Sequence, residues 1–166
     1  MKKTKRVAVF ALFTALAFTL SFLETLIPIN VGVPGVKIGL ANLVVVAALY
    51  LLDEKEAFAV SMIRILISGL LFTGAFSLLY SFAGGILSFS VMLLAKKSEK
   101  LSVLGVSVLG AAVHNIGQII VAAIVMQTAK IVYYLPVLLI SGVIAGIIVG
   151  IISKILVERL SKINLK

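Results

Sequence analysis

Long apolar segments recur along almost the whole chain, and they constrain the fold more than any other feature. Short polar or basic breaks separate them, and 62% of the 166 residues are hydrophobic. A bilayer's hydrocarbon core is about 30 Å thick, so a spanning helix needs roughly 20 apolar residues. The chain has room for six such helices and almost nothing else, which predicts a single integral-membrane domain over residues 1–166.

The breaks place the ends of these helices and predict an all-α protein with six transmembrane segments. The predicted ranges are 6–26, 38–52, 57–72, 76–95, 102–127 and 132–157. The first range follows a basic start, as in a signal peptide, but its apolar run is too long for one. No small-residue cleavage site precedes Glu24 and Pro28, so we expect a retained first helix.

The net charge of +9 reflects topology and does not indicate nucleic-acid binding. The basic residues form three clusters: Lys2, Lys3, Lys5 and Arg6; Lys96, Lys97 and Lys100; Lys154, Arg159, Lys162 and Lys166. The positive-inside rule fills such positions on the cytoplasmic side. An even number of spans then puts both termini in the cytoplasm, and we expect a multi-pass protein of the bacterial cell (plasma) membrane. Lys130, in an outer turn, is a small exception.

The segment from Ile27 to Asn42 interrupts the apolar pattern with two prolines, several glycines and a lysine. Pro28 and Pro34 have no backbone N–H, so the segment cannot be helical throughout. Irregular backbone at membrane depth occurs only where protein covers it or where it lines a watery cavity. We predict that the segment dips into the outer half of the protein and presents Lys37 to a cavity; the alternative is an ordinary exposed connector.

Few charged or strongly polar residues fall within the membrane domain, and such residues mark a functional site by default. They are Glu24, Lys37, Asn42, Arg64, His114, Asn115 and Gln118. A mid-helix arginine costs about 2.5–3.5 kcal/mol on the insertion scale, so Arg64 must face a partner or water. Glu24 is the acid available to pair with Arg64 or Lys37. If it neutralises only one base, the remaining positive charge favours an anionic ligand; otherwise a buried ion pair merely fixes helix packing.

His114 and Gln118 lie one helical turn apart, with Asn115 beside them. Such a set can bind a carbonyl, a carboxylate or a ring nitrogen. The alternative is interhelical hydrogen bonding, which contributes only about 0.6 kcal/mol on average in a membrane. The glycines and serines of residues 81–88 favour a packing face, and Tyr133 and Tyr134 favour an interfacial aromatic belt.

Several catalytic arrangements are missing from the sequence. There is no P-loop for ATP hydrolysis and no aspartate cluster to hold Mg²⁺ against a diphosphate. The chain has no cysteine, and a lone histidine makes a poor metal site. We therefore expect no enzyme activity, cofactor or metal.

Small residues line one face of the first predicted helix. Ala8, Ala11 and Ala15 share this face, and the step from Ala11 to Ala15 is a small-xxx-small pattern. Such a step lets the backbone of another helix approach closely.

Four motifs resemble one family of small membrane proteins over nearly the whole chain. They are PGVKIGLAN at Pro34–Asn42, RILISGLLF at Arg64–Phe72, SFAGGILS at Ser81–Ser88 and HNIGQ at His114–Gln118. The family is labelled heptaprenyl diphosphate synthase component I, or Gx transporter. Its proteins look like membrane subunits that lack the aspartate-rich motifs of a prenyltransferase.

The length, the six spans and ALFTA at Ala11–Ala15 also resemble the substrate-binding S components of energy-coupling factor (ECF) transporters. In those proteins an alanine-xxx-alanine step on the first helix packs against a transmembrane coupling subunit, which two ATPase subunits drive. The resemblance implies that Ala11 and Ala15 form the docking face here. It also implies that the loop between the first two helices is part of a lid, with Lys37 in or under it.

From the residues and the resemblance together, we expect an ECF-type S subunit. It would take up a small, anionic, partly apolar molecule that is vitamin-like or an isoprenoid or quinone precursor. Its partners would be the lipid membrane, the coupling subunit and two ATPase subunits. The expected ligand residues are Lys37, Asn42, Arg64, His114, Asn115 and Gln118. The alternative is a membrane accessory subunit of a heptaprenyl diphosphate synthase.

Overall fold

The computed structural model describes residues 3–27 and 39–163, and all regular structure in these ranges is helical. The six main helices are α1 (Lys3–Leu26), α2 (Leu40–Leu51), α3 (Glu54–Ser68), α4 (Gly74–Lys97), α5 (Val103–Val125) and α6 (Leu135–Leu160). Three short elements join or follow them: a π-helical turn η1 (Gly69–Thr73) and the 3₁₀ helices η2 (Ala129–Tyr134) and η3 (Ser161–Ile163). The all-α prediction is confirmed.

Several helix ends differ from the predicted ones, each for a local reason. The predicted turn at 53–56 is already helical from Glu54, because acidic residues are favourable in a first turn. α2 starts at Leu40 instead of 38, because Gly39 has a left-handed φ of 79°. The predicted end of the third helix, 69–72, is a π turn, and the start of the sixth, 132–134, is a 3₁₀ turn.

Four segments of the described chain are long and apolar enough to cross a membrane: α1, α4, α5 and the continuous stretch from η2 through α6. This length and composition are typical of a membrane protein. α2 is apolar but has only 12 residues, which corresponds to about 18 Å at 1.5 Å per residue. By length alone α2 falls short of a hydrocarbon core of about 30 Å, as does the somewhat longer helix predicted at 38–52, at about 22 Å.

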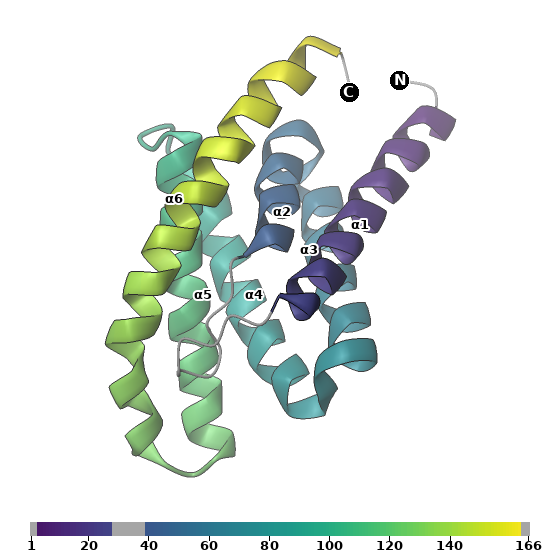
Figure 1. Ribbon diagram of the computed structural model, residues 1–166. Helices are drawn as coiled ribbons and strands as arrows, with labels where there is room; N and C mark the ends of the chain where they lie inside the picture. Colours follow the sequence, from purple (N-terminus) through teal and green to yellow (C-terminus); the bar gives the residue numbers. More distant parts are fainter. Residues whose placement is uncertain (1–2, 28–38, 164–166) are drawn as a thin grey trace.

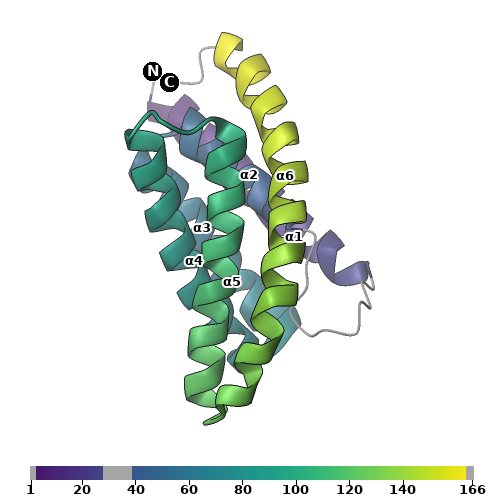
Figure 2. The same cartoon turned by 90° about the vertical axis from the view of Figure 1, so that its left-hand side faces the viewer.

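α2 is the central helix of the bundle (Figures 1 and 2). It packs against α1, α3 and α6, while α5 lies between α4 and α6. Eight of its 12 residues are buried. A helix that is apolar on all sides is stable only where other helices surround it. This explains why α2, which is apolar on all sides, lies at the centre.

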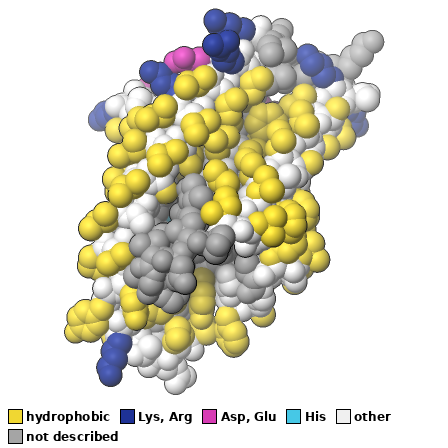
Figure 3. Space-filling view, viewed as in Figure 1, with side chains coloured by type: hydrophobic (Ala, Val, Ile, Leu, Met, Phe, Trp, Pro, Cys, Tyr) yellow, Lys and Arg dark blue, Asp and Glu magenta, His cyan; other side chains and the backbone are white. Residues whose placement is uncertain are grey.

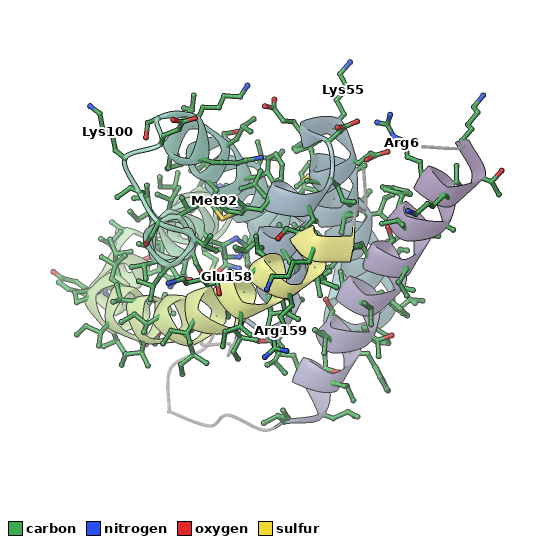
Figure 4. All side chains as sticks on the ribbon, turned by 90° about the horizontal axis from the view of Figure 1, so that it is seen from above. Arg6, Lys55, Met92, Lys100, Glu158 and Arg159 are labelled. Carbon is green, nitrogen blue, oxygen red and sulfur yellow. The ribbon has the colours of Figure 1, made fainter. Side chains whose placement is uncertain are left out.

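Charged side chains gather at the end where α1 begins and α6 ends (Figure 3). The α2–α3 turn and the α4–α5 loop lie at the same end (Figures 1 and 2). Arg6 of α1 pairs there with Asp53 and Glu56, and Lys97 of α4 pairs with Glu54 at 2.9 Å. Seen from above this end, Lys55 and Lys100 point outward (Figure 4).

These pairs lie at the solvent-exposed end of the bundle, so they add little to the stability of the fold. Their main consequence is to hold the ends of α1 and α4 close to the start of α3. The clustering at one end is what a cytoplasmic face would require.

Glycines let α4 and α5 approach closely. A Cβ added to Gly117 of α5 would lie 2.9 Å from the Cα of Gly84 on α4. A Cβ added to Gly84 would lie 2.7 Å from the carbonyl oxygen of His114. In a membrane, where lipid tails are as apolar as the helices, such close packing is a main source of helix association.

We predict that Gly117→Ala lowers the free energy of unfolding by about 1–3 kcal/mol, the usual cost of overpacking a tight contact. The matched control is Gly105→Ala on the same helix, because its added Cβ would meet only the side chain of Leu101 at 3.4 Å. Thermal unfolding of both purified variants in detergent measures the difference. Equal melting temperatures for the two variants would contradict a close crossing at Gly84 and Gly117.

Candidate functional site

A cavity of about 150 Å³ lies within the bundle, and all six main helices contribute to its lining. Six of the polar residues predicted from the sequence line it: Glu24, Asn42, Arg64, His114, Asn115 and Gln118. They come from α1, α2, α3 and α5, which are separated in the sequence but converge at this point. Lys37, the remaining predicted ligand residue, lies outside the described residues.

The cavity has further polar lining residues that the sequence pattern does not single out. They are Ser21, Thr25, Ser68, Ser81 and Ser141. Ser68 could have been found, because it lies one turn after Arg64 and therefore on the same face of α3. Ser81 belongs to the predicted packing face, whereas in the structure it reaches the cavity. For the other three, a hydroxyl in an apolar helix gives no distinguishing signal.

Arg64 and Ser68 bring unused hydrogen-bonding atoms to the cavity. One terminal guanidinium nitrogen of Arg64, Nη2, donates to Oδ1 of Asn42 at 3.0 Å. Arg64 Nε and Ser68 Oγ are buried and have no hydrogen-bond partner in the structure. A buried polar group without a partner costs about 1–3 kcal/mol, and more where the group is charged. The hydrogen-bonding capacity of both atoms is therefore unused within the described structure, at two residues that line the cavity.

Glu24 makes a hydrogen bond to the backbone. One of its carboxylate oxygens, Oε1, accepts from the backbone N–H of Gly39 at 2.5 Å. Gly39 has a left-handed backbone, with φ of 79°, and its carbonyl accepts from the N–H of Asn42 at 2.9 Å. The acid on α1 thus fixes the start of α2, which positions Asn42 beside Arg64.

No ion pair within 4.0 Å joins Glu24 to Arg64 in the described structure, although pairing with Arg64 or Lys37 is the role that the sequence predicts for Glu24. Each of the two charged groups bonds to a neutral group instead. The cavity lining therefore carries one positive and one negative side chain that do not neutralise each other by direct contact.

On α5, two of the three predicted residues have distinct surroundings. Asn115 Nδ2 donates to the carbonyl of Leu138 at 2.5 Å, which joins α5 to α6 and leaves Oδ1 as an acceptor. The side chain of Gln118 has no hydrogen-bond partner in the part of the chain that the structure describes. Interhelical hydrogen bonding, the alternative role for these three residues, therefore accounts for one bond of Asn115. The side-chain amide of Gln118 takes part in no such bond within the described part of the chain.

The third residue, His114, packs close to α4. A Cβ added to Gly84 would lie 3.2 Å from Cε1 of its ring. The glycine at the helix crossing therefore also makes room for the imidazole, and any larger residue at position 84 would reshape this side of the cavity.

A π-helical turn borders the cavity. η1 directly follows Ser68, and its first residue, Gly69, lines the cavity. A Cβ on Gly69 would lie 2.4 Å from the side chain of Leu78, so the turn requires a glycine at this position. Single π turns inside helices are frequent at functional sites because they redirect the neighbouring side chains.

Aromatic rings hold α1 against this turn. The ring centroid of Phe72 in η1 lies 5.7 Å from that of Phe18 and 5.2 Å from that of Phe22. Offset ring pairs at such distances contribute about 0.5–1.5 kcal/mol beyond the area they bury. They hold the part of α1 that carries Glu24 close to the turn that carries Gly69.

The alanine stripe lies on the side of α1 away from the buried residues Phe13 and Ala17, in line with Phe18 and Phe22 further along the helix. Ala8, Ala11 and Ala15 are exposed, whereas Phe13 and Ala17 are buried against the bundle. No other described helix covers the stripe, so it is accessible to a second protein or to lipid.

The cavity can bind through charge and hydrogen bonds. Among the described residues, no group of three or more histidine, cysteine, aspartate or glutamate side chains could hold a metal ion. The lining offers a guanidinium, a carboxylate, three amides, an imidazole and several hydroxyls. These groups have the chemistry to bind a polar molecule through its charge and its hydrogen-bonding pattern.

A family model described as heptaprenyl diphosphate synthase component I matches residues 13–156. The matched range contains every described residue that lines the cavity. It is the family that the four sequence motifs resemble, and this prediction is confirmed. Comparisons with curated proteins and with solved structures found no match.

Proposed function

The chain belongs to the heptaprenyl diphosphate synthase component I family, and from this premise we propose that it is the substrate-binding subunit of an ECF-type transporter. One observation carries the proposal: a cavity lined by polar residues from all six helices, at which Arg64 Nε and Ser68 Oγ are buried without partners. A bound anionic group, such as a carboxylate, would accept hydrogen bonds from both atoms and would offset the cost of burying the guanidinium.

The cavity chemistry supports binding over catalysis. Prenyl transfer requires carboxylates that hold Mg²⁺ against a diphosphate. Among the described lining residues the only carboxylate is that of Glu24, and it bonds to the backbone of Gly39. The chain would therefore capture its ligand without altering it, and it would act as no enzyme on its own.

Transport requires partners, because the sequence contains no P-loop to hydrolyse ATP. In the proposal these partners are a transmembrane coupling subunit and two ATPase subunits. The exposed face of Ala8, Ala11 and Ala15 is the docking surface for the coupling subunit. Ligand would enter from outside, at the half of the bundle away from the charged end.

The proposal includes six membrane crossings, with both ends of the chain in the cytoplasm. We predict that a cysteine replacing Ser98, in the α4–α5 loop, is labelled only from the cytoplasm. A cysteine replacing Thr128, just before η2, should be labelled from outside. The chain has no native cysteine, so a membrane-impermeant maleimide applied to intact cells and to inverted vesicles reports each position separately. Labelling of both positions from the same side would contradict this topology.

The family description favours a second candidate, a membrane accessory subunit of a heptaprenyl diphosphate synthase. Co-purification distinguishes the two. The tagged full-length chain is extracted from its native membrane in mild detergent, and its partners are identified by mass spectrometry. We expect a transmembrane coupling subunit with two ATPase subunits. Recovery of a soluble prenyltransferase in stoichiometric amount, without ATPases, would favour the synthase subunit and contradict the transporter.

A further inference from the structure

The size of the cavity limits the ligand. A cavity of about 150 Å³ matches the volume that encloses one benzene molecule in a protein interior. The cavity is partly open, and the space within it holds roughly six non-hydrogen atoms. A prenyl diphosphate is several times larger than that.

The lining limits the polarity of the ligand. Of the 17 described residues that line the cavity, 11 have polar or charged side chains. Only Ile65, Ala111 and Ala145 contribute purely apolar ones. An isoprenoid tail in this space would leave Arg64 Nε and Ser68 Oγ without partners, at about 1–3 kcal/mol for each atom. A compact polar molecule would satisfy them.

The charges limit the ligand further. Arg64 and Glu24 both line the cavity, no ion pair within 4.0 Å joins them, and they bond separately to Asn42 and Gly39. Charges interact strongly where water is excluded, so a bound molecule should pair with both charged side chains and leave no net charge among the ligand, Arg64 and Glu24. A diphosphate would bring two or three negative charges to a single guanidinium and would also meet the carboxylate of Glu24.

We infer that the ligand is a compact zwitterion of the amino-acid type. Its carboxylate accepts from Arg64 and Ser68, and its ammonium group donates to Glu24. Glu24 has acceptor capacity for this, because an ionised carboxylate offers about four lone-pair sites and the N–H of Gly39 takes one. The inference rests on the proposed function and names the substrate class of the same site, and it excludes a prenyl diphosphate.

The test uses the purified full-length chain in lipid nanodiscs and measures thermal unfolding and isothermal titration. The probes are the twenty standard amino acids, the hydroxy acids lactate and malate, and geranyl diphosphate. Lactate matches alanine, and malate matches aspartate, with a hydroxyl in place of the ammonium group. The variants are Arg64→Met and Glu24→Gln; the glutamine keeps an oxygen that can accept from Gly39 and removes only the charge. Glu99→Gln, in the exposed α4–α5 loop, is the matched control.

We expect at least one amino acid to bind the wild-type chain, with its affinity lowered at least tenfold by Arg64→Met and by Glu24→Gln but unchanged by Glu99→Gln. A hydroxy acid of the same size should bind at least tenfold more weakly. Three results would overturn the inference: no amino acid binds, a matched hydroxy acid binds equally well, or Glu24→Gln has no effect. If geranyl diphosphate binds the wild-type chain and Arg64→Met abolishes that binding, the ligand is not a zwitterion. The cavity would then still be a ligand-binding site. The proposed function fails separately, if no ATPase subunits co-purify.

Discussion

Replacement of Arg64 by methionine should weaken ligand binding by about 2–5 kcal/mol, the range for truncating one partner of a buried charge pair. In affinity this is a loss of roughly 30-fold to several thousand-fold. The reason is that the ligand's anionic group would lose the guanidinium, while the methionine would keep much of the side chain's volume. The measurement is isothermal titration of the purified variant with the molecule that mass spectrometry identifies in the wild-type preparation.

The control is Arg159→Met, which removes the same charge from the exposed last turn of α6 and from a residue that does not line the cavity. It should leave affinity unchanged. One other result for Arg64→Met would show that this arginine has a structural role and does not bind the ligand. If the variant unfolds at a lower temperature without ligand but binds with wild-type affinity, the guanidinium serves mainly to hold Asn42 and the start of α2.

A tryptophan in place of Ala11 or Ala15 should abolish assembly with the coupling subunit while folding and ligand binding stay intact. Both alanines are exposed on α1, so the indole can lie outside the bundle without displacing a buried side chain. It would instead keep a partner helix from approaching a small-xxx-small face, where the close contact depends on small side chains. A pull-down of the coupling subunit and a ligand-binding assay on the same samples measure the two effects separately.

Ile144→Trp on α6 is the matched control, because Ile144 is likewise exposed and apolar but lies on another helix. It should assemble normally. If both tryptophan variants assemble fully with the coupling subunit, the alanine stripe is not a docking surface. The main reason to place α1 against a coupling subunit would then be lost.

The sequence alone determined the number and type of the main helices. Apolar runs bounded by polar breaks give this information locally, because a helix in an apolar environment satisfies its own backbone hydrogen bonds. The sequence also selected Glu24, Asn42, Arg64, His114, Asn115 and Gln118, and all six line one cavity. They stand out because polar groups are costly at membrane depth and are therefore rare within apolar helices. Whether they bind a ligand stays a prediction.

Only the tertiary structure decided how these residues bond to one another. Glu24 bonds to Gly39 and Asn115 bonds to Leu138, and each contact joins helices that the sequence does not relate. The π turn at Gly69 depends on the nearby side chain of Leu78, and the central place of α2 depends on three neighbouring helices. A helical period gives the face on which a side chain lies but not the atom opposite it. That atom is set by how the helices pack, through contacts between residues far apart in the chain.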